Sequence, residues 1–403
     1  RKDIMAITEV AHQIHFLGGP ALTDLGYDAD NNITQDSSLV VGPWGVTPYD
    51  NVSNFFKQGL RTNNSVTLSG GGAKSSYFLS VSNLRDDGIV PLNTFDRTTV
   101  RLTGSGQIAS NLKATGSLSY SNSAGQRVQQ GSNLSGLMLG LLRTPPSFDN
   151  SAGYENPDGT QRNYRSGGGY DNPFWTVNKN PFNDNVNRVF GYTSLEWSPL
   201  ENLLVKYRYG IDQYSDVRKQ IIAKNSRTFP GGSIRDEAYT VREQNHDLTA
   251  NYNTDFGDIG LNVLAGLNTN QRDYKSIYTY GTGLVLPDFY NMSNAQTQFA
   301  YESNTGRRLW GIYAEAQLDY KDWAFLTLTA RRDQASTFGN VGTPILYPSA
   351  SLAVVLTDAL DIKSDFLSML KLRASTAQVG SEPPFASNAT YFNQGSVGSG
   401  WIN

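Results

Sequence analysis

Apolar and polar residues alternate along most of this 403-residue chain. In the stretch 112–120, the even positions carry Leu112, Leu118 and Tyr120 among small residues, whereas the odd positions carry Lys113 and hydroxyl side chains. Successive side chains of a β-strand point to opposite faces of the sheet. The pattern therefore predicts a strand with one apolar and one polar face.

The same alternation recurs at 203–212 and at 308–320, and weaker versions bring the total to about twelve strands, several of them 9–11 residues long. We expect one set of positions on the three clearest strands to face lipid: Leu112, Leu118, Val205, Tyr207, Ile211, Trp310, Ile312 and Leu318. We expect the other set to face the lumen of a barrel: Lys113, Arg208, Asp212, Glu315 and Gln317.

The connections between these strands alternate between short and long. Short connections are expected at 70–74, 109–110, 199–202, 257–258 and 321–322, and long ones at 85–93, 123–185, 214–236, 273–304 and 333–345. Short periplasmic turns and long extracellular loops are typical of a transmembrane β-barrel. The fold class predicted is therefore all-β, an antiparallel meander. We expect 134–142 to be a short helix or a buried loop segment, and 357–369 to be a short helix in a periplasmic turn.

The composition supports this interpretation and excludes others. Charged residues make up 17% of the chain, and it contains 39 Gly, 22 Tyr and no Cys. Without Cys there is no disulfide and no thiolate metal site. A formal net charge of -3 gives no basic field for nucleic acid. A run of about 18 apolar residues, which a transmembrane helix needs, is absent from the sequence.

Motifs that carry chemistry are weak. The segment 69–75 looks like a phosphate loop, but Ala73 precedes the Lys where Gly is required, so a hairpin turn explains it. Asp28, Asp30 and Asn32 have the spacing of calcium ligands without the required Gly and closing Glu. His12 and His15 have no identifiable third ligand. We therefore expect no metal-ligating motif, no cofactor and no enzymatic activity, while a looser calcium site in a loop stays open.

The longest predicted loop contains the best candidate contact surface. Six residues there combine aromatic rings with an amide and a carboxylate, which suits a sugar or a partner protein: Tyr164, Tyr170, Asp171, Asn172, Phe174 and Trp175. The alternative is that the loop is a structural cover, with Leu137, Met138 and Leu141 tucked into the mouth of the barrel.

Two blocks of sequence resemble a known family. Residues 64–101 read NSVTLSGGGAKSSYFLSVSNLRDDGIVPLNTFDRTTVR. Further on stand ARRDQASTFG at 330–339, Tyr347-Pro348-Ser349, and LKLRAS at 370–375. In order and spacing these resemble barrel-wall and turn signatures of the SusC/RagA family of TonB-dependent outer-membrane transporters. The resemblance extends over about 49–380.

The resemblance implies a barrel of about 22 strands around a plug. It further implies an outer-membrane importer of glycan or peptide fragments, embedded in outer-membrane lipid. Its partners would be a SusD-like surface lipoprotein and TonB, which would act through a plug domain that this chain does not contain. On this interpretation the chain is a fragment, with 1–60 as a lead-in between plug and barrel and 61–403 as the N-terminal part of the barrel.

Two other classes of protein remain open from the sequence. One is a passive porin or autotransporter-type barrel of about twelve strands that closes on itself, and the other is a soluble all-β carbohydrate-binding protein. The family blocks and the very long first loop favour the importer over the porin. The strict alternation of connection length favours a membrane barrel over the soluble fold. The substrate, whether oligosaccharide or peptide, stays open.

Overall fold

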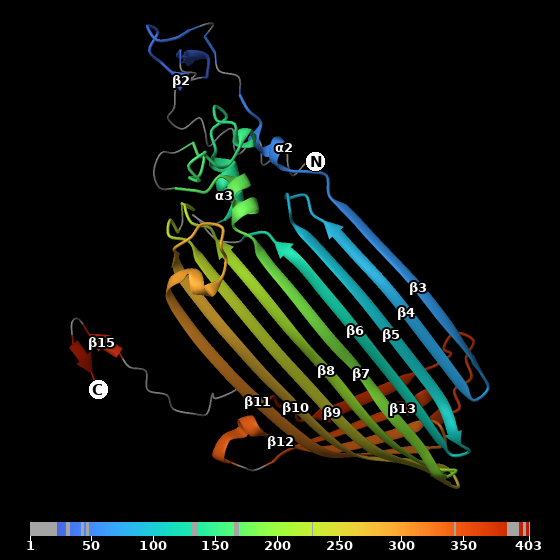
Figure 1. The fold of residues 1–403 in the computed structure, drawn as a ribbon. Helices are drawn as coiled ribbons and strands as arrows, with labels where there is room; N and C mark the ends of the chain where they lie inside the picture. The colour runs from blue at the N-terminus through green and yellow to red at the C-terminus, as the bar shows by residue number, and fades with distance from the viewer. Residues whose placement is uncertain are drawn as a thin grey trace.

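A twelve-stranded antiparallel sheet dominates the structure, a computed structural model (Figure 1). The structure describes residues 22–29, 33–41, 44–45, 48–129, 136–164, 169–227, 229–341, 344–384, 395–397 and 400–402. Strands β3 to β14 pair in sequence order, each with its next neighbour. The prediction of an all-β antiparallel meander with about twelve strands is confirmed.

The strands of this sheet are β3 (Leu60–Gly72), β4 (Ser75–Asp87), β5 (Thr94–Ala109), β6 (Leu112–Arg127), β7 (Phe182–Leu200), β8 (Leu203–Ile222), β9 (Ser233–Phe256), β10 (Ile259–Leu284), β11 (Ala295–Tyr320), β12 (Ala324–Ala335), β13 (Ile345–Val355) and β14 (Lys371–Ala377). Two small hairpins lie outside it: β1 (Gly26–Tyr27) with β2 (Ile33–Thr34), and β15 (Gly395–Val397) with β16 (Gly400–Ile402).

The helices are short and lie in the connections. They are α2 (Asn51–Phe55), α3 (Leu137–Arg143), α4 (Pro173–Lys179) and α5 (Leu356–Ala359), with 3-10 turns η1 (Leu22–Asp24), η2 (Asn150–Ala152), η3 (Met292–Asn294) and η4 (Ser336–Val341). Both predicted helices exist, at α3 and, over four residues only, at α5. Within the described residues, no helix is long and apolar enough to cross a membrane.

The pairing register sorts side chains onto two faces. In an antiparallel pair, directly opposed residues point to the same side of the sheet. Following these pairs, Leu112 lies opposite Trp197, Trp197 opposite Val205, and the same face continues to Ala314 on β11. All eight residues predicted to face lipid share this side, here named the outer face. The five predicted to face the lumen share the other, here named the inner face.

The outer face carries an apolar belt. Large apolar side chains are exposed on it from one edge of the sheet to the other, among them Val66, Leu102, Leu195, Ile312 and Leu352. At one end of the belt Tyr209, His246 and Trp310 lie in one row across the four strands β8–β11, with Thr269 of β10 between the last two. Tyr207 Oη lies 2.8 Å from His246 Nδ1. Aromatic rings at the edge of an apolar band are typical of a membrane interface.

Four central strands extend far beyond this belt. Strands β8, β9, β10 and β11 contain 20, 24, 26 and 26 residues, whereas about 9–11 suffice to cross the hydrocarbon core. The predicted long loops 214–236 and 273–304 were wrong in extent, because the actual connections are 223–232 and 285–294. Likewise 123–185 shortens to 128–181, and 333–345 to 336–344.

These loops were predicted too long because apolar and polar residues alternate only where a strand has lipid on one face and water on the other. Beyond the aromatic row the outer face becomes polar, with Gln213, Arg242 and Asp273 in one paired row. Both faces of these strand extensions are therefore largely polar, and the alternation that reveals a strand in lipid fades. The hydrogen-bonded ladder continues regardless, because it depends on the backbone.

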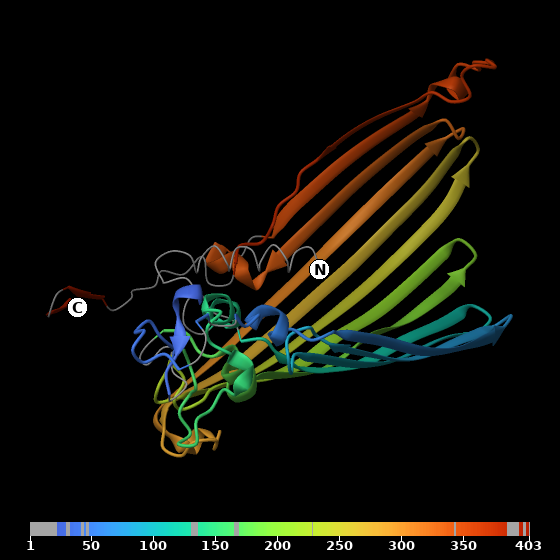
Figure 2. The same cartoon turned by 90° about the horizontal axis from the view of Figure 1, so that it is seen from above.

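The sheet is strongly curved. Figure 2 shows it bending from β3 in blue to β14 in red, and in Figure 1 strands β12–β14 lie behind the front strands. Within the described residues, β3 and β14 each pair on one side only. Short turns gather at one end of the strands and long connections at the other. The exception is 356–370, a long connection at the short-turn end, closed by a Leu356 N–H to Leu370 carbonyl bond of 2.7 Å.

An arginine substituted on the outer face tests how far the apolar belt extends along the strands. Ala314→Arg places a charge in the middle of the belt and should lower the free energy of unfolding in lipid vesicles by about 2–4 kcal/mol. Val217→Arg, on the same face beyond the aromatic row, should cost less than about 1 kcal/mol. Urea titration of the two variants reconstituted in vesicles makes the comparison. Equal costs would mean that Val217 also lies in hydrocarbon.

Candidate functional site

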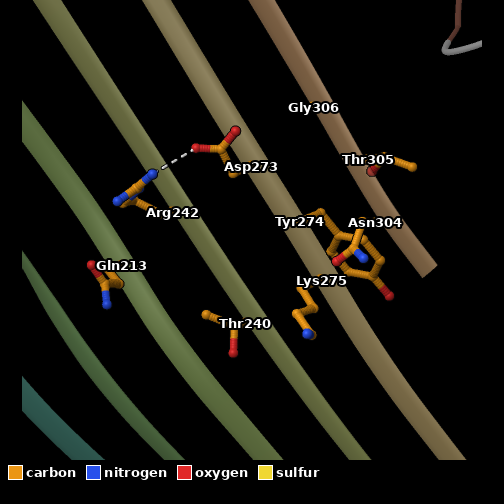
Figure 3. Close-up of a pocket in the computed structure, with 9 residues that line it drawn as sticks. All are labelled: Gln213, Thr240, Arg242, Asp273, Tyr274, Lys275, Asn304, Thr305 and Gly306. Carbon is orange, nitrogen blue, oxygen red and sulfur yellow. Dashed lines mark hydrogen bonds and ion pairs between the residues drawn. The ribbon is translucent and has the colours of Figure 1, made fainter. Parts of the chain in front are cut away.

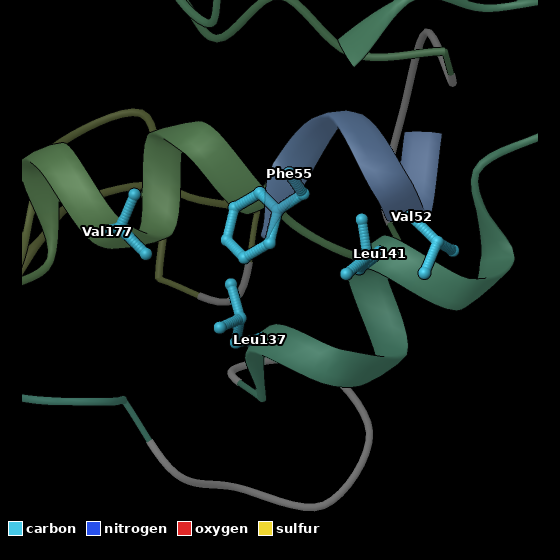
Figure 4. Packing of buried hydrophobic residues seen from close by; sticks show 5 residues of the cluster. All are labelled: Val52, Phe55, Leu137, Leu141 and Val177. Atoms are coloured by element: carbon cyan, nitrogen blue, oxygen red, sulfur yellow. The ribbon is translucent and has the colours of Figure 1, made fainter. Parts of the chain in front are cut away.

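The described residues of three long connections, 128–181, 223–232 and 285–294, pack into one body at the end of the sheet. This body, together with the described residues 48–59, is named here the loop layer. Its apolar core joins α3 and α4 to the small helix α2, which precedes the first strand (Figure 4). Phe55, Leu137 and Leu141 are at most 2% exposed in this core. The helix α2 is thus fixed to the same end of the sheet as the long connections.

Hydrogen bonds to backbone atoms of the first long connection show where the segment before β3 lies. Asn51 Nδ2 donates to the Phe148 carbonyl at 2.7 Å, and Asn51 Oδ1 accepts from the Asn150 N–H at 2.9 Å. The Tyr49 N–H donates to the Pro146 carbonyl at 2.7 Å. The described residues 48–59 therefore belong to the loop layer, opposite the short turns.

Polar bonds join the first and second connections of the loop layer. The Trp175 indole N–H donates to Ser226 Oγ at 2.8 Å, and Ser226 Oγ in turn donates to Asn180 Oδ1 at 3.1 Å. Asn180 Oδ1 also accepts from the Ala223 N–H at 2.8 Å. The indole ring is 1% exposed, so the bond is shielded from water.

Asp171 is the second junction. Its Oδ1 accepts from Gln161 Nε2 at 2.8 Å and from the Arg227 N–H at 2.6 Å, and its Oδ2 lies 3.4 Å from Asn180 Nδ2. Burial raises the pKa of the Asp171 carboxyl above its ordinary value of 3.8, although these hydrogen bonds act in the opposite direction. A buried carboxylate is stabilised here by three donors.

The third connection is joined by a shared cation. Lys179 Nζ, at the end of α4, lies 3.0 Å from Glu155 and 3.2 Å from Asp288. Asp288 also accepts from Tyr290 Oη at 2.9 Å. Burial, and after it this carboxylate, raises the pKa of Tyr290. The loop layer is therefore held by an apolar core on one side and by polar junctions on the other.

The six predicted contact residues divide into two groups. Trp175, Asp171 and Asn172 are at most 5% exposed, so in this conformation they pack inside the loop layer, and their contact with a partner stays a prediction. The other three, Tyr164, Tyr170 and Phe174, are half-buried. Tyr170 Oη accepts from Arg143 at 2.6 Å, and the Phe174 ring lies 5.0 Å from that of Phe55.

The structural-cover alternative describes most of this loop better. Leu137 and Leu141 are buried as that alternative requires, whereas Met138 is 39% exposed. Leu137 and Leu141 pack against Phe55 and Val177 within the loop layer. The sequence analysis did not identify Asn180, Ser226 and Gln161, because isolated polar residues in a loop belong to no periodic pattern that would distinguish them.

The five predicted inner-face residues lie along one polar wall. Asp212 accepts from Arg188 Nε at 2.8 Å, and Arg208 lies over the Tyr192 ring at 4.5 Å. Gln317 donates to Glu315 at 2.6 Å. Lys113 sits opposite Glu196 in the register. These contacts are an ion pair, a cation–ring contact and an amide hydrogen bond, as expected for a wall in contact with water.

The inner face of the strand extensions is rich in aromatic rings. All six tyrosines on β8–β11 beyond the belt point inward by register, with Phe299 beside them: Tyr214, Tyr239, Tyr274, Tyr278, Tyr280 and Tyr301. Arg218 lies over Tyr239 at 4.9 Å, and Arg235 over Tyr278 at 5.4 Å. The spacing of Tyr274, Tyr278 and Tyr280 by even numbers was a signal in the sequence that the analysis above did not use.

Metal chemistry finds no support in the described residues. No group of three or more His, Asp or Glu side chains there could hold a metal ion. His12, His15, Asp30 and Asn32 lie outside the described residues.

This architecture is that of an outer-membrane β-barrel wall. Residues 139–403 match the family described as TonB dependent receptor-like, beta-barrel. The chain therefore belongs to the TonB-dependent receptor-like β-barrel family, whose place is the outer membrane.

Individual relatives agree with that assignment. The chain is 25% identical to TonB-dependent receptor P39 of Formosa agariphila over 383 residues, which are 89% of this chain and 34% of that protein. For receptor P26 of the same organism the identity is 21%, over 79% of this chain and 32% of the relative. The chain thus spans about a third of the length of these relatives.

Solved structures share the fold. The RagAB peptide importer in the open-open state superposes with a TM-score of 0.72 at 17% identity, covering 93% of this chain and 43% of that one. The RagAB peptide transporter gives 0.69 at 18% identity, covering 81% and 38%. The predicted resemblance to SusC/RagA transporters is thus confirmed at the level of fold.

Removing the buried indole should loosen the loop layer without affecting the barrel. Trp175→Ala should cost about 3–5 kcal/mol of local stability, since it deletes a large buried ring and its bond to Ser226. Hydrogen exchange of amides in 136–181 and 223–232 should accelerate, while that of the strands is unchanged. Met138→Ala, on the exposed side of α3, is the matched control. Unchanged protection in Trp175→Ala would show that the ring does not hold the layer.

The loop layer should also respond to pH through Asp171. Because the folded pKa is raised, the folded state keeps a proton that the unfolded state has already lost in the window above 3.8. Stability of the loop layer should therefore fall as the pH rises through that window. Limited proteolysis between about pH 4 and about pH 7 measures it. Asp171→Asn should remove the dependence; an identical slope would exclude Asp171 as its origin.

Proposed function

We propose that this chain forms part of the wall and the extracellular loop layer of a TonB-dependent importer of glycan or peptide fragments. Residues 61–403 supply wall and loops, and the inner face lines the lumen. We infer that the described residues 48–59 belong to the extracellular loop layer instead of leading directly from a plug to the barrel. TonB would act through a plug outside this chain.

The observation that carries the proposal is the sorting of aromatic rings beyond the membrane. There both faces of the strands meet water, so lipid does not dictate which face takes the rings. All six tyrosines nevertheless point inward, and Tyr301 and Phe299 are 66% and 60% exposed. Exposed rings beside paired charges suit the apolar faces of sugars and peptide side chains.

The charges on this wall compensate one another. Arg218 pairs with Asp216 at 2.6 Å and approaches Glu237 at 3.9 Å, and Arg235 approaches Glu237 at 3.9 Å. The wall thus offers hydrogen-bonding groups without a strong field of one sign. This supports binding of a polar, amphipathic fragment and gives no reason to expect hydrolysis or group transfer.

A surface lipoprotein of the SusD type is the proposed partner. The RagAB structures, described as a peptide transporter and a peptide importer, share this fold. The loop layer is held together by an apolar core, hydrogen bonds and ion pairs, and it lies at the end of the strands where such a partner would dock. Its half-buried Tyr164, Tyr170 and Phe174 are the remaining candidates for contact.

Loss of the inward rings should weaken uptake. In cells that produce the full-length receptor, Tyr278→Ala with Tyr280→Ala should raise the half-saturating concentration of labelled glycan or peptide fragments about tenfold, since stacking contributes about 0.5–1.5 kcal/mol per ring. Ile277→Ala, which directly precedes Tyr278 in the strand but lies on the outer face, is the control and should have no effect. Uptake that survives deletion of TonB, or is equally reduced in both variants, would contradict the proposal.

A further inference from the structure

One connection at the short-turn end of the sheet is long and apolar. It spans 356–370 between β13 and β14, whereas other turns at this end, such as 201–202 and 257–258, contain two small or polar residues. In Figure 2 it projects in red from the end of the sheet. Its exposed large apolar side chains are Leu360, Ile362, Phe366, Met369 and Leu370, and the Phe366 ring is 99% exposed. Exposed apolar side chains gathered in this way mark contact with a membrane or another protein.

The stagger of the strand ends gives the level at which this connection starts. Tilted strands keep their ends level with the membrane only if successive hairpins are displaced along the register. Followed through the pairing to β11, the β5–β6 turn lies in the row of Ala314, the β7–β8 turn in that of Ala316 and the β9–β10 turn in that of Tyr320. Each hairpin thus ends at least two residues further toward the short-turn side than the hairpin before it.

The β13–β14 hairpin does not keep this stagger. Two hairpins after β9–β10, its strands should end at least four residues beyond the row of Tyr320, but they end one residue beyond it. At about 3.4 Å per residue and a strand tilt of about 40°, the difference is about 8 Å of height. The headgroup layer of a bilayer is about 5–8 Å thick on each side. The connection therefore starts inside the membrane interface, where the neighbouring strands are still paired.

The apolar belt continues into the connection on the outer face. Leu372 lies on that face in the same row as Tyr320, and it is 57% exposed. The Leu356 N–H bond to the Leu370 carbonyl extends the ladder past the last paired strand residues. At the opposite end of the strands, by contrast, the outer face becomes a polar pocket across β8–β11 (Figure 3). Only at the short-turn end do apolar side chains extend beyond the strands.

An aromatic pair marks the same level. The Val355 N–H donates to the Trp323 carbonyl at 2.7 Å, and the Trp323 ring lies 5.3 Å from the Tyr320 ring. Tyr and Trp at the ends of strands are typical of a membrane interface. The connection leaves β13 directly after Val355, so its first residues lie beside this pair.

The charges of the connection limit how it can bind lipid. It carries three aspartates and one lysine, and Lys363 Nζ lies 3.1 Å from Asp361. Anionic headgroups repel such an acidic segment, so attraction to them does not hold it at the membrane. Burial of apolar surface is the interaction that remains.

We propose that the connection 356–370 inserts its apolar side chains into the periplasmic leaflet of the outer membrane, between the phospholipid headgroups and the start of the acyl chains. Interfacial segments bury apolar side chains about 5–10 Å deep in this way. The contact holds the connection in the plane of the membrane and away from the opening of the lumen. This placement rests on the short turns facing the periplasm, as in the proposed function, and on no substrate.

A spin label measures this insertion. The full-length receptor, without other cysteines, is labelled at Phe366→Cys and reconstituted in vesicles of phosphatidylethanolamine and phosphatidylglycerol. Paramagnetic resonance compares access of oxygen, which partitions into lipid, with access of a nickel chelate, which stays in water. The oxygen-to-nickel ratio should be at least about threefold higher than at Glu201→Cys, the matched control in the β7–β8 turn. It should persist at high salt and in vesicles without phosphatidylglycerol, because apolar burial is not screened.

Three results would overturn the proposal. A ratio equal to that at Glu201→Cys would mean that the connection lies in water, and a ratio lost at high salt would mean an electrostatic contact. Low access of both reagents would mean that protein covers the site, either another part of the receptor or a second copy. Heat-modifiable migration on gels verifies assembly. If Phe366→Cys fails to assemble, Met369→Cys must give the high ratio, or the proposal falls. The label reports lipid contact whether or not the receptor imports, so this proposal and the proposed function fail separately.

Discussion

The constraint on which the structure depends is the need to satisfy every backbone polar group where no water is present. In hydrocarbon an unpaired N–H or carbonyl costs several kcal/mol, so strands that cross it must pair along their full length. Within the described residues, β4 to β13 have a neighbouring ladder on both sides, and β3 and β14 have one on a single side. Once the backbone is committed to pleated strands, side chains can only alternate. Lipid on one side and water on the other then require apolar and polar residues to alternate along the sequence.

Prediction from sequence succeeded where that pattern is enforced. The positions of Leu118, Val205 and Ile312 on one face, and of Lys113 and Arg208 on the other, follow from alternation alone. It failed at 214–236 and 273–304, where strands continue beyond lipid and both faces are largely polar. A ladder of backbone hydrogen bonds has no signature in side-chain hydrophobicity, so strand length outside the membrane could not be read from the pattern.

The candidate site was harder to predict, for a different physical reason. The loop layer depends on pairs such as Trp175 with Ser226 and Asp171 with the Arg227 N–H, which are more than fifty residues apart in sequence. Aromatic and carboxylate side chains in a loop suggest either contact with a partner or internal packing, and composition does not decide between them. Burial distinguishes them, because the Trp175 side chain is 1% exposed and has almost no surface accessible to a partner in this conformation.

Beyond the membrane the two faces of one sheet still differ, and this difference is informative because lipid no longer imposes it. The inner face gathers tyrosines whose rings lie near Arg218 and Arg235, while the outer face gathers Arg242, Lys275 and amides with few rings. A purely structural extension would have no reason to segregate them, since either set is soluble on either side. The segregation supports the proposal that the two faces meet different surroundings, with a molecule that has apolar ring or side-chain faces on the inside. The same four strands can serve both because a pleated strand presents independent sets of side chains to its two sides.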